Sequence, residues 1–288
     1  MPVKKKTAPK SVAKKPAKKA LKKAAAPAKK AVKAKAVAKP APKPAAKPAP
    51  KAAAKVKIPA AKKPVAEVEK SVANKGVPRI PKDKIRHIAI AGNIGAGKST
   101  LTRLLAKHFG WLPHYEDVEN NPYLNDFYED MPRWSFNLQV FFLNSRFRQI
   151  IEIQKGEEVV IQDRTIHEDA CIFAPNLHSM GLMSTRDFEN YTRLFETIGS
   201  LIRPPDLLIY LRASVPTLVN QIQKRGREYE DNLRLDYLKR LNEFYEKWIS
   251  SYTGRLLIID VDQTNFAEDE NALSDVIHRV NTELFGLF

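Results

Sequence analysis

Short apolar runs alternate with longer amphipathic stretches over the last two thirds of the chain. Runs at residues 86–91, 158–162, 206–211 and 256–260, and a weaker one at 112–116, have the character of buried parallel strands. Apolar residues at helical spacing separate them, at residues 100–108, 133–154, 165–178, 185–201, 214–224, 232–251 and 267–285. This alternation predicts an α/β fold with a five-stranded parallel sheet and helices on both faces. In such a sheet, ligands bind at the carboxyl ends of the strands.

The first 66 residues lack this pattern. They consist almost wholly of Lys, Ala, Pro and Val, with 22 Lys, 11 Pro and no acidic or aromatic residue. So few large apolar groups cannot offset the ~1–2 kcal/mol per residue that backbone ordering costs, so we predict that this tail is disordered. Residues 67–84 contain acids again and are expected to link the tail to a folded domain at residues 85–288.

The net charge divides in the same way. The whole chain carries +17 and the tail +22, so the remaining residues carry −5 and are not a basic nucleic-acid-binding fold. The tail resembles the Lys/Ala/Pro-rich tails of linker histones, which implies binding to nucleic acid or other polyanions through counterion release. A merely solubilising extension is the alternative. No apolar run approaches the ~20 residues that span a bilayer. The N-terminus has no apolar secretory segment, so we expect a cytoplasmic protein, associated with nucleic acid if the tail is used.

A glycine-rich loop follows the first predicted strand. Residues 92–99, GNIGAGKS, match the pattern GxxxxGK[ST] between a strand and a helix, which is the context of a phosphate-binding P-loop. Lys98 should reach the β- and γ-phosphates of a nucleoside triphosphate, and the Ser99 hydroxyl should bind Mg²⁺. The predicted ATP-binding residues are Gly92, Asn93, Ile94, Gly95, Ala96, Gly97, Lys98, Ser99 and Thr100.

Four further segments narrow the function. Residues 115–124 place an acid after the second strand, and residues 127–139 place a phenol eleven residues before an amide. The third strand closes with QDRT at residues 162–165, and an arginine-rich loop, KRGREYE, occupies residues 224–230. With the P-loop, these segments resemble the deoxyribonucleoside kinase family from about residue 85 to the C-terminus. The bacterial deoxyadenosine/deoxyguanosine kinase branch is most similar, through the ENNPYL, FYED and FFLNSRF segments.

The resemblance implies a general base for the sugar 5′-hydroxyl, which is a poor nucleophile until its proton is removed. Glu116 matches the family's catalytic glutamate. Asp117 stands where the family has a proline, so the choice of base between Glu116 and Asp117 remains open at this point.

The resemblance also implies residues that handle the phosphoryl group. Asp163 is expected to bind Mg²⁺ together with Ser99, and Arg164 to bind the phosphoryl group. Arg225 and Arg227 match the family's lid arginines, which stabilise the charge spread over the transferred group. We call residues 224–230 the lid.

Nucleoside recognition is implied in the same way. Tyr128 and Glu230 match residues that hold the 3′-hydroxyl, and Gln139 matches the amide that makes paired hydrogen bonds to the base edge. Phe173 is expected to stack on the base. Trp134 also matches a family residue, but core packing explains it equally well.

Arg146 and Asp169 match a charged pair at the deep end of the pocket in purine- and cytosine-accepting members. The resemblance therefore implies a deoxyadenosine or deoxyguanosine kinase, with deoxycytidine as a second substrate, that uses ATP and Mg²⁺. It also implies a homodimer. A structural ion pair without influence on the base is the alternative role for this pair.

Two other functions compete with this hypothesis. A nucleotide kinase of the thymidylate kinase type would share the P-loop and the lid. A nucleic-acid-binding protein with an ATP-binding anchor would explain the tail, but not Tyr128 or Gln139. The single cysteine excludes an internal disulfide, and we expect Cys171 to be a buried structural thiol.

Overall fold

The computed structural model describes residues 84–116, 118, 120–227 and 234–286. The predicted disordered tail and nearly all of the linker lie outside these residues. Five parallel strands form one sheet in the order β2-β3-β1-β4-β5. The strands are β1 His87–Gly92, β2 Leu112–His114, β3 Val160–Asp163, β4 Leu207–Arg212 and β5 Leu256–Asp260. The predicted five-stranded parallel sheet is confirmed.

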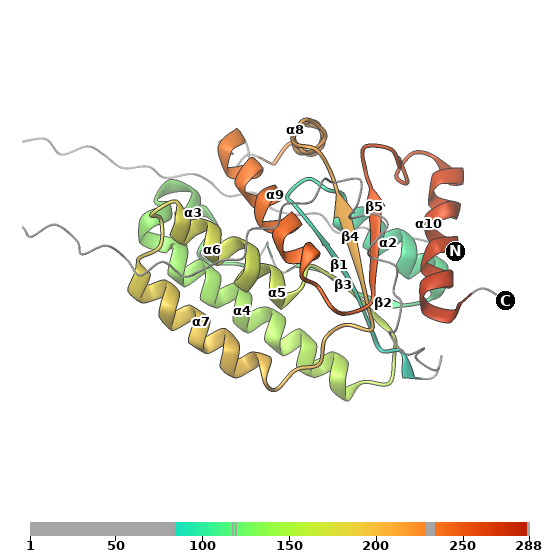
Figure 1. The fold of residues 1–288 in the computed structure, drawn as a ribbon, viewed down its shortest axis with the longest axis horizontal. Helices are drawn as coiled ribbons and strands as arrows, with labels where there is room; N and C mark the ends of the chain where they lie inside the picture. The colour runs from blue at the N-terminus through green and yellow to red at the C-terminus, as the bar shows by residue number, and fades with distance from the viewer. Residues whose placement is uncertain (1–83, 117, 119, 228–233, 287–288) are drawn as a thin grey trace, which may run out of the picture. The chain divides into compact units, whose positions relative to one another are not determined.

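Helices cover both faces of this sheet (Figure 1). The α-helices in chain order are α2 Lys98–Phe109, α3 Leu124–Glu129, α4 Met131–Lys155, α5 Ile166–Glu168, α6 Ala174–Ser179, α7 Thr185–Gly199, α8 Val215–Arg225, α9 Leu235–Ser250 and α10 Glu270–Phe285. One π-helical segment, η2 Asp169–Phe173, joins α5 to α6. Helices α2 and α10 lie on one side of the sheet, and α4, α6, α7 and α9 lie on the other.

The central strand β1 is buried on both faces, and its side chains alternate between two cores. Ile88 and Ile90 pack into the core beneath α2 and α10, whereas Ala89 and Ala91 belong to the core beneath α4, α7 and α9. All six residues of β1 are buried. Burial on both faces explains why the strand has a nearly continuous apolar sequence.

Neighbouring helices begin at side-chain caps that the sequence supplies. Asp130 accepts a hydrogen bond from the backbone N–H of Arg133 at the start of α4, where proline occupies the first turn. Ser184 does the same for Asp187 at the start of α7. A capping oxygen satisfies one of the N–H groups that a helix start leaves without a partner. These caps fix the starts of α4, which lines the cavity described below, and of α7, which packs against α4.

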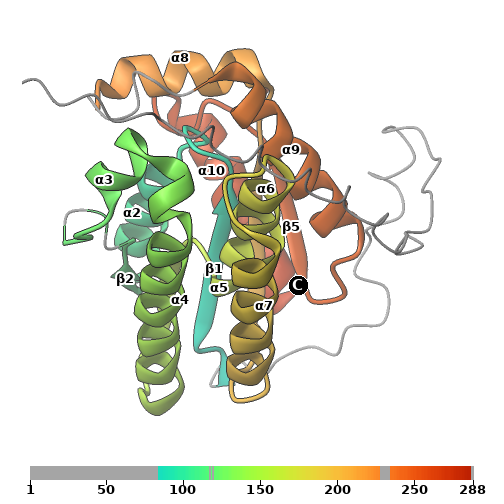
Figure 2. The ribbon, with the colours of Figure 1, turned by 90° about the vertical axis from the view of Figure 1, so that its left-hand side faces the viewer.

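The strands of the sheet point toward one end, where the functional loops gather. In Figure 2, α8 crosses above this end, over the loop between β1 and α2. The strand order reverses at β1, which has β3 on one side and β4 on the other. Ligands bind at such switch points in open α/β sheets.

The segment after β3 differs from the predicted single helix over residues 165–178. It consists of α5, the π-helical segment η2 and α6, and the backbone N–H of Ala174 donates to the carbonyl of Asp169, five residues earlier. Pro175 has no N–H to donate to the carbonyl four residues before it, which disfavours a regular α-helix at this point. Helix α3 was not predicted either, because its six residues are too short for a periodic pattern.

Candidate active site

The P-loop, residues 92–100, connects β1 to α2 as predicted. Gly95 and Gly97 have φ values of 84° and 89°, a left-handed conformation that glycine adopts without steric cost. A side chain at Gly95 would lie 2.7 Å from the carbonyl oxygen of Leu218 on α8. The close approach shows that the P-loop packs directly against the helix that leads into the lid.

Asn93, the second P-loop residue, joins this loop to α9. Its side-chain amide donates to the carbonyl of Leu238 at 3.1 Å and to Oδ1 of Asn242 at 2.6 Å. Asn242 in turn donates to the carbonyl of Ala213 at 2.8 Å, just after β4. The P-loop is therefore tied to the chain on both sides of the lid.

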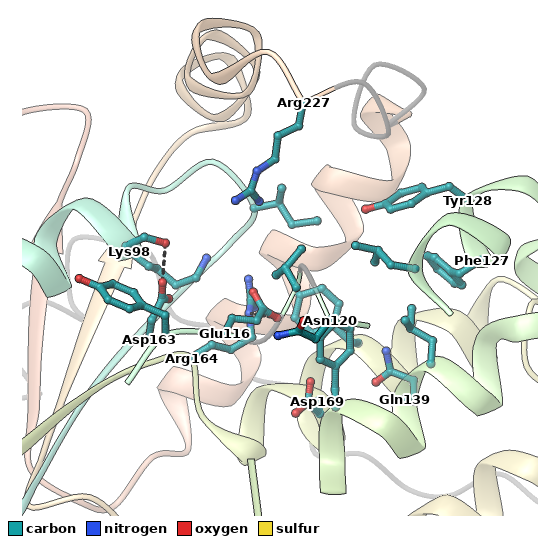
Figure 3. A pocket seen from close by; sticks show the side chains of 18 of the residues that line it. Lys98, Glu116, Asn120, Phe127, Tyr128, Gln139, Asp163, Arg164, Asp169 and Arg227 are labelled. Carbon is teal, nitrogen blue, oxygen red and sulfur yellow. Dashed lines mark hydrogen bonds and ion pairs between the residues drawn. The ribbon is translucent and has the colours of Figure 1, made fainter. Parts of the chain in front are cut away.

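Lys98 lies at the start of α2 with its charged group turned toward the cavity (Figure 3). Its Nζ donates to the carbonyl of Asn93 at 3.0 Å. Burial, together with the nearby charge of Arg164, lowers the pKa of Lys98 to about 8. The lysine is thus held near the turn of the loop, where phosphate oxygens bind in other P-loops.

Ser99 and Asp163 form a pair of oxygen donors beside the loop. The Ser99 hydroxyl donates to Oδ2 of Asp163 at 2.5 Å. Within the described chain, the buried Oδ1 of Asp163 has no hydrogen-bond partner. Burial raises the pKa of Asp163, although the charge of Lys98 opposes the shift. A hydroxyl beside a carboxylate suits Mg²⁺, which prefers oxygen ligands, so the pair fits the metal predicted here.

Glu116 follows β2 and faces two arginines. Its Oε1 lies 2.6 Å from the Nη2 of Arg146 and 3.4 Å from the Nε of Arg164. Burial alone would raise the pKa of Glu116, but the charges of Arg164, Arg146 and Lys98 outweigh burial and lower it to about 2. The carboxylate is therefore ionised, as a general base must be. Asp117, the alternative base, lies outside the described residues.

A chain of hydrogen bonds supports the backbone next to Glu116. His87 contacts Oε1 of Gln162 at 2.9 Å, and Gln162 donates to Oε1 of Gln149 at 2.9 Å. Gln149 then donates to the carbonyl of Tyr115 at 3.0 Å. Burial lowers the pKa of His87 to about 4. These hydrogen bonds attach the segment that follows β2 to three elements, β1, β3 and α4.

A cavity of about 450 Å³ extends from the P-loop between α3, α4 and α9. The predicted residues on its wall are Lys98, Ser99, Glu116, Tyr128, Gln139, Asp163, Arg164, Asp169, Phe173, Arg225 and Arg227, with Ile94 of the P-loop. Sequence reasoning missed the remaining wall residues Tyr115, Val118, Asn120, Leu124, Phe127, Leu138, Phe142 and Tyr237. Figure 3 shows Phe127, Tyr128 and Gln139 at the end away from Lys98. The structure thus brings these twelve predicted residues into one cavity, whereas the predicted Arg146 is not on the wall but contacts two wall residues, Glu116 and Asp169.

The deep end of the cavity is charged. Arg146 bridges Glu116 and Asp169, with its Nη1 at 2.9 Å from Oδ2 of Asp169. Burial raises the pKa of Asp169 to about 7, against the charge of Arg146. Oε1 of Gln139 is buried and has no hydrogen-bond partner among the described residues. A buried amide oxygen of this kind is available to a ligand, because leaving it without a partner is costly.

Two predicted aromatic residues have different positions. Phe173 lies on the cavity wall, and the guanidinium carbon of Arg164 lies 4.6 Å from the centre of its ring. Trp134 is not on the wall; it packs against Tyr123 and beneath Arg133. Phe173 can therefore contact a ligand, whereas packing accounts for Trp134.

The lid arginines flank the end of α8. Arg225 is the last residue of the helix, Gly226 is its cap with a φ of 64°, and Arg227 follows. Both arginines line the cavity, and Figure 3 shows Arg227 reaching in from above. Glu230, predicted to hold the 3′-hydroxyl, lies outside the described residues.

Cys171 plays no part in the cavity. It is half-buried rather than fully buried, packs against the core, and burial raises the pKa of its thiol to about 11. A thiol with so high a pKa is a poor nucleophile at neutral pH. No group of three or more His, Cys, Asp or Glu side chains within the described ranges could hold a metal by itself.

The P-loop lies at the switch point of the sheet, with an ionised acid beside it and arginines above it. This arrangement is typical of a P-loop kinase. A family model for deoxynucleoside kinases matches residues 88–285, and the chain belongs to this family. It is 39% identical to a deoxyadenosine/deoxycytidine kinase of Bacillus subtilis over 206 residues, which cover 70% of this chain and 93% of that protein. It is 37% identical to a deoxyguanosine kinase of Lactobacillus johnsonii over 207 residues, which cover 68% of this chain and 92% of that protein.

A solved structure of deoxyadenosine kinase from M. mycoides with bound dATP is also similar. Its TM-score is 0.61 at 29% identity, and the match covers 67% of this chain and 98% of that one. The family resemblance predicted from the sequence is confirmed. The alternatives of a thymidylate-type nucleotide kinase and of an ATP-gated nucleic-acid anchor are not favoured, because these matches are nucleoside kinases.

Proposed function

We propose that this enzyme transfers the γ-phosphoryl group of Mg²⁺-ATP to the 5′-hydroxyl of a purine deoxynucleoside. Deoxyadenosine or deoxyguanosine is the preferred acceptor, and deoxycytidine is a second one. The observation that supports the proposal best is the position of Glu116. Its ionised carboxylate lies between Arg146 and Arg164, where the P-loop end of the cavity meets the nucleoside end.

At the phosphate end, residues 92–100 would hold the triphosphate through backbone N–H groups, and Lys98 would contact its outer phosphates. Ser99 and Asp163 would hold Mg²⁺, which neutralises charge on the β- and γ-phosphates. Arg164 and the lid arginines, Arg225 and Arg227, would stabilise the charge that spreads over the transferred group. All these side chains line the same cavity.

At the nucleoside end, Glu116 would accept the proton of the 5′-hydroxyl. Tyr128, with Glu230, would hold the 3′-hydroxyl. Gln139 would pair with the base edge through its buried amide, and Phe173 would stack on the base. Together these contacts would hold the deoxynucleoside between the aromatic side chains of the cavity wall and the P-loop.

The Arg146–Asp169 pair would select the base. A charged pair at the deep end offers hydrogen bonds to an amino-bearing base and no apolar room for the 5-methyl group of thymine. Curated relatives with deoxyadenosine, deoxyguanosine and deoxycytidine in their names agree with this choice. We therefore expect poor turnover of thymidine.

Phosphoryl transfer assays test the function directly. The purified full chain is mixed with Mg²⁺-ATP and each of the four deoxynucleosides, deoxyadenylate or thymidylate. We expect turnover on deoxyadenosine or deoxyguanosine and a loss of roughly 10²–10⁴-fold in kcat for Glu116→Gln, since the amide cannot act as a base. The exposed Glu157→Gln variant is the matched control and should retain activity. Turnover of monophosphates alone, or of thymidine alone, would contradict the proposal.

Outside the cavity, we propose that the Lys-rich tail binds polyanions such as nucleic acid. Its 22 lysines without a neutralising acid support this, because each phosphate contact releases counterions. We also propose a cytoplasmic homodimer, the assembly implied by the family resemblance; light scattering after size exclusion measures its mass. No helix in the described part of the chain is long and apolar enough to cross a membrane.

A further inference from the structure

Glu168 is a fully buried carboxylate to which no motif assigned a role. It is the last residue of α5 and has 0% exposure. Its Oε1 accepts from the backbone N–H of Gly92 at 3.2 Å, from the hydroxyl of Tyr245 at 2.7 Å and from Arg164 at 3.3 Å. Its Oε2 accepts from the backbone N–H of Thr165 at 2.7 Å. Glu168 thus connects Gly92, the first P-loop residue, to Arg164, which lies beside the proposed catalytic base Glu116.

Arg164 has an unfavourable backbone conformation, which its surroundings must stabilise. Its φ is 73°, and it is the only non-glycine residue with a positive φ in the described ranges. A side chain in the left-handed region costs roughly 1–2 kcal/mol and persists only where the surroundings impose it. The backbone N–H of Arg164 still donates to the carbonyl of Ile90 in β1 at 2.9 Å, so the positive φ falls at the point where the chain leaves the sheet. This conformation directs the guanidinium into the cavity.

Tyr245 completes the support from α9. Its hydroxyl accepts from Nη1 of Arg164 at 2.9 Å. The same hydroxyl lies 2.8 Å from the carbonyl oxygen of Gly92 and 2.7 Å from Oε1 of Glu168, to either of which its one proton can be donated. Two side chains consequently contact the backbone of Gly92: its N–H donates to Glu168, and its carbonyl oxygen lies within hydrogen-bond distance of the Tyr245 hydroxyl.

The charges of the buried groups explain why a carboxylate is needed here. Arg164 is buried and contacts two acids, Glu116 at 3.4 Å and Glu168 at 3.3 Å. A buried guanidinium requires compensating negative charge. Without Glu168, Glu116 alone would supply this compensating negative charge. The guanidinium would then shift toward Glu116 and away from its place beside the transferred phosphoryl group.

We propose that Glu168 is a positioning residue for phosphoryl transfer: with Tyr245, it holds the Arg164 guanidinium and the start of the P-loop in one fixed arrangement. The proposal rests on the function proposed above. It predicts an effect on the chemical step larger than on nucleoside binding, because Glu168 is absent from the cavity wall and acts through Arg164 and Gly92.

The test compares Glu168→Gln, Tyr245→Phe and the double variant in the full-length chain. For Glu168→Gln we expect kcat to fall roughly 10- to 100-fold, the scale of a misplaced catalytic group, while KM for the deoxynucleoside changes less than about threefold. Tyr245→Phe should lower kcat less. The double variant should lose less activity than the product of the two single losses, because the two side chains act on the same groups.

The matched control is Glu189→Gln on α7. Glu189 also pairs with an arginine four positions away, Arg193 at 3.8 Å, but both side chains are exposed. This variant should keep wild-type kcat. All rates are measured well below the unfolding midpoint of each variant, so that a loss of folded protein does not enter kcat.

The outcomes separate this proposal from the proposed function. An active wild type with unchanged kcat in Glu168→Gln, even with a lower unfolding temperature, would show a merely structural role and overturn the proposal. If Glu168→Gln does not fold, Tyr245→Phe decides: a reduced kcat supports the proposal and an unchanged kcat overturns it. If the wild type phosphorylates no deoxynucleoside, the proposed function fails. Calorimetric measurement of ADP binding then tests whether Glu168 holds the start of the P-loop. Binding several-fold weaker in Glu168→Gln than in the wild type supports the proposal, and equal binding overturns it.

Discussion

His87 is a buried histidine at the first position of β1, and we propose no role for it in phosphoryl transfer. It is 7% exposed and hydrogen-bonded to Gln162. Burial lowers the pKa of His87 from 6.5 to about 4, so the neutral ring is the form that fits the fold. The hydrogen bond to Gln162 by itself favours the protonated ring, but burial outweighs it.

This pKa predicts how stability responds to acid. The unfolded chain binds the histidine proton more tightly than the folded one, so the contribution of His87 is fully present above about pH 6.5. It is lost as the pH falls from there toward 4, by at most about 3 kcal/mol. Urea unfolding between pH 7.5 and pH 4.5 should therefore show a smaller loss for His87→Gln than for the wild type. The exposed His278→Gln variant should follow the wild type, and a slope unchanged in His87→Gln would contradict the prediction.

Individual residues also show what sequence could not supply. The resemblance of the chain's motifs to those of the deoxyribonucleoside kinase family implied one shared site for Glu116, Asp163 and Arg227, and all three residues line the same cavity. The burial of Glu168 could not be predicted, because a glutamate four positions after an arginine is also typical of an exposed helix surface. Tyr237 was missed for a similar reason: its spacing on α9 is that of ordinary core packing.

At the scale of elements, helix α8 ends where the lid begins. Its cap, Gly226, has a left-handed φ of 64°, and among the described residues beyond its chain neighbours no atom lies within 4 Å of the place where a side chain would start. Gly110 caps α2 with a φ of 70° and equally open surroundings, far from the lid. The two glycines therefore differ in position but not in local geometry.

Replacing these glycines with alanine should separate stability from catalysis. Both variants should lose about 1 kcal/mol of unfolding free energy, because a β-carbon disfavours the left-handed region. Only Gly226→Ala should also lower kcat, by roughly tenfold, since it redirects the backbone between Arg225 and Arg227. Gly226→Asn should recover most of the loss, because asparagine tolerates this conformation. Equal kcat values for Gly226→Ala and Gly110→Ala would contradict the prediction.

Element boundaries were predictable where apolar pattern and packing coincide. The strand at residues 256–260 was predicted with the bounds that β5 has, because the polar Arg255 precedes the apolar run and Asp260 ends it. The π-helical turn η2 was not predicted. Apolar spacing alone does not distinguish a π-helical turn from an α-helical one, although Pro175, whose missing N–H disfavours a regular α-helix, follows it closely.

At the scale of the whole molecule, charge and catalysis occupy different parts of the chain. The two hydrophobic cores lie within residues 85–285, whereas the +22 charge lies in residues 1–66. A chain that begins at residue 84 should therefore keep the kcat and unfolding free energy of the full chain. It should lose salt-dependent binding to DNA.

Fluorescence anisotropy with duplex DNA measures this loss between about 50 and 200 mM salt, where phosphate contacts weaken steeply. The length-matched control is the full chain with its 22 tail lysines replaced by glutamine. We expect binding by the full chain alone, with an affinity that falls as salt rises. Equal binding by the shortened chain would show that the folded domain, not the tail, contacts DNA.

The bridge from Asn93 through Asn242 to Ala213 has a mechanical consequence. One end of the bridge meets the chain just before α8, and the other meets α9 just after the lid. The three hydrogen bonds therefore hold Ala213, just before α8, and Leu238, on α9, at fixed positions relative to the phosphate-binding loop. Movement of α8 toward a bound triphosphate would therefore have to start from a fixed point at Ala213, without displacing the sheet beneath.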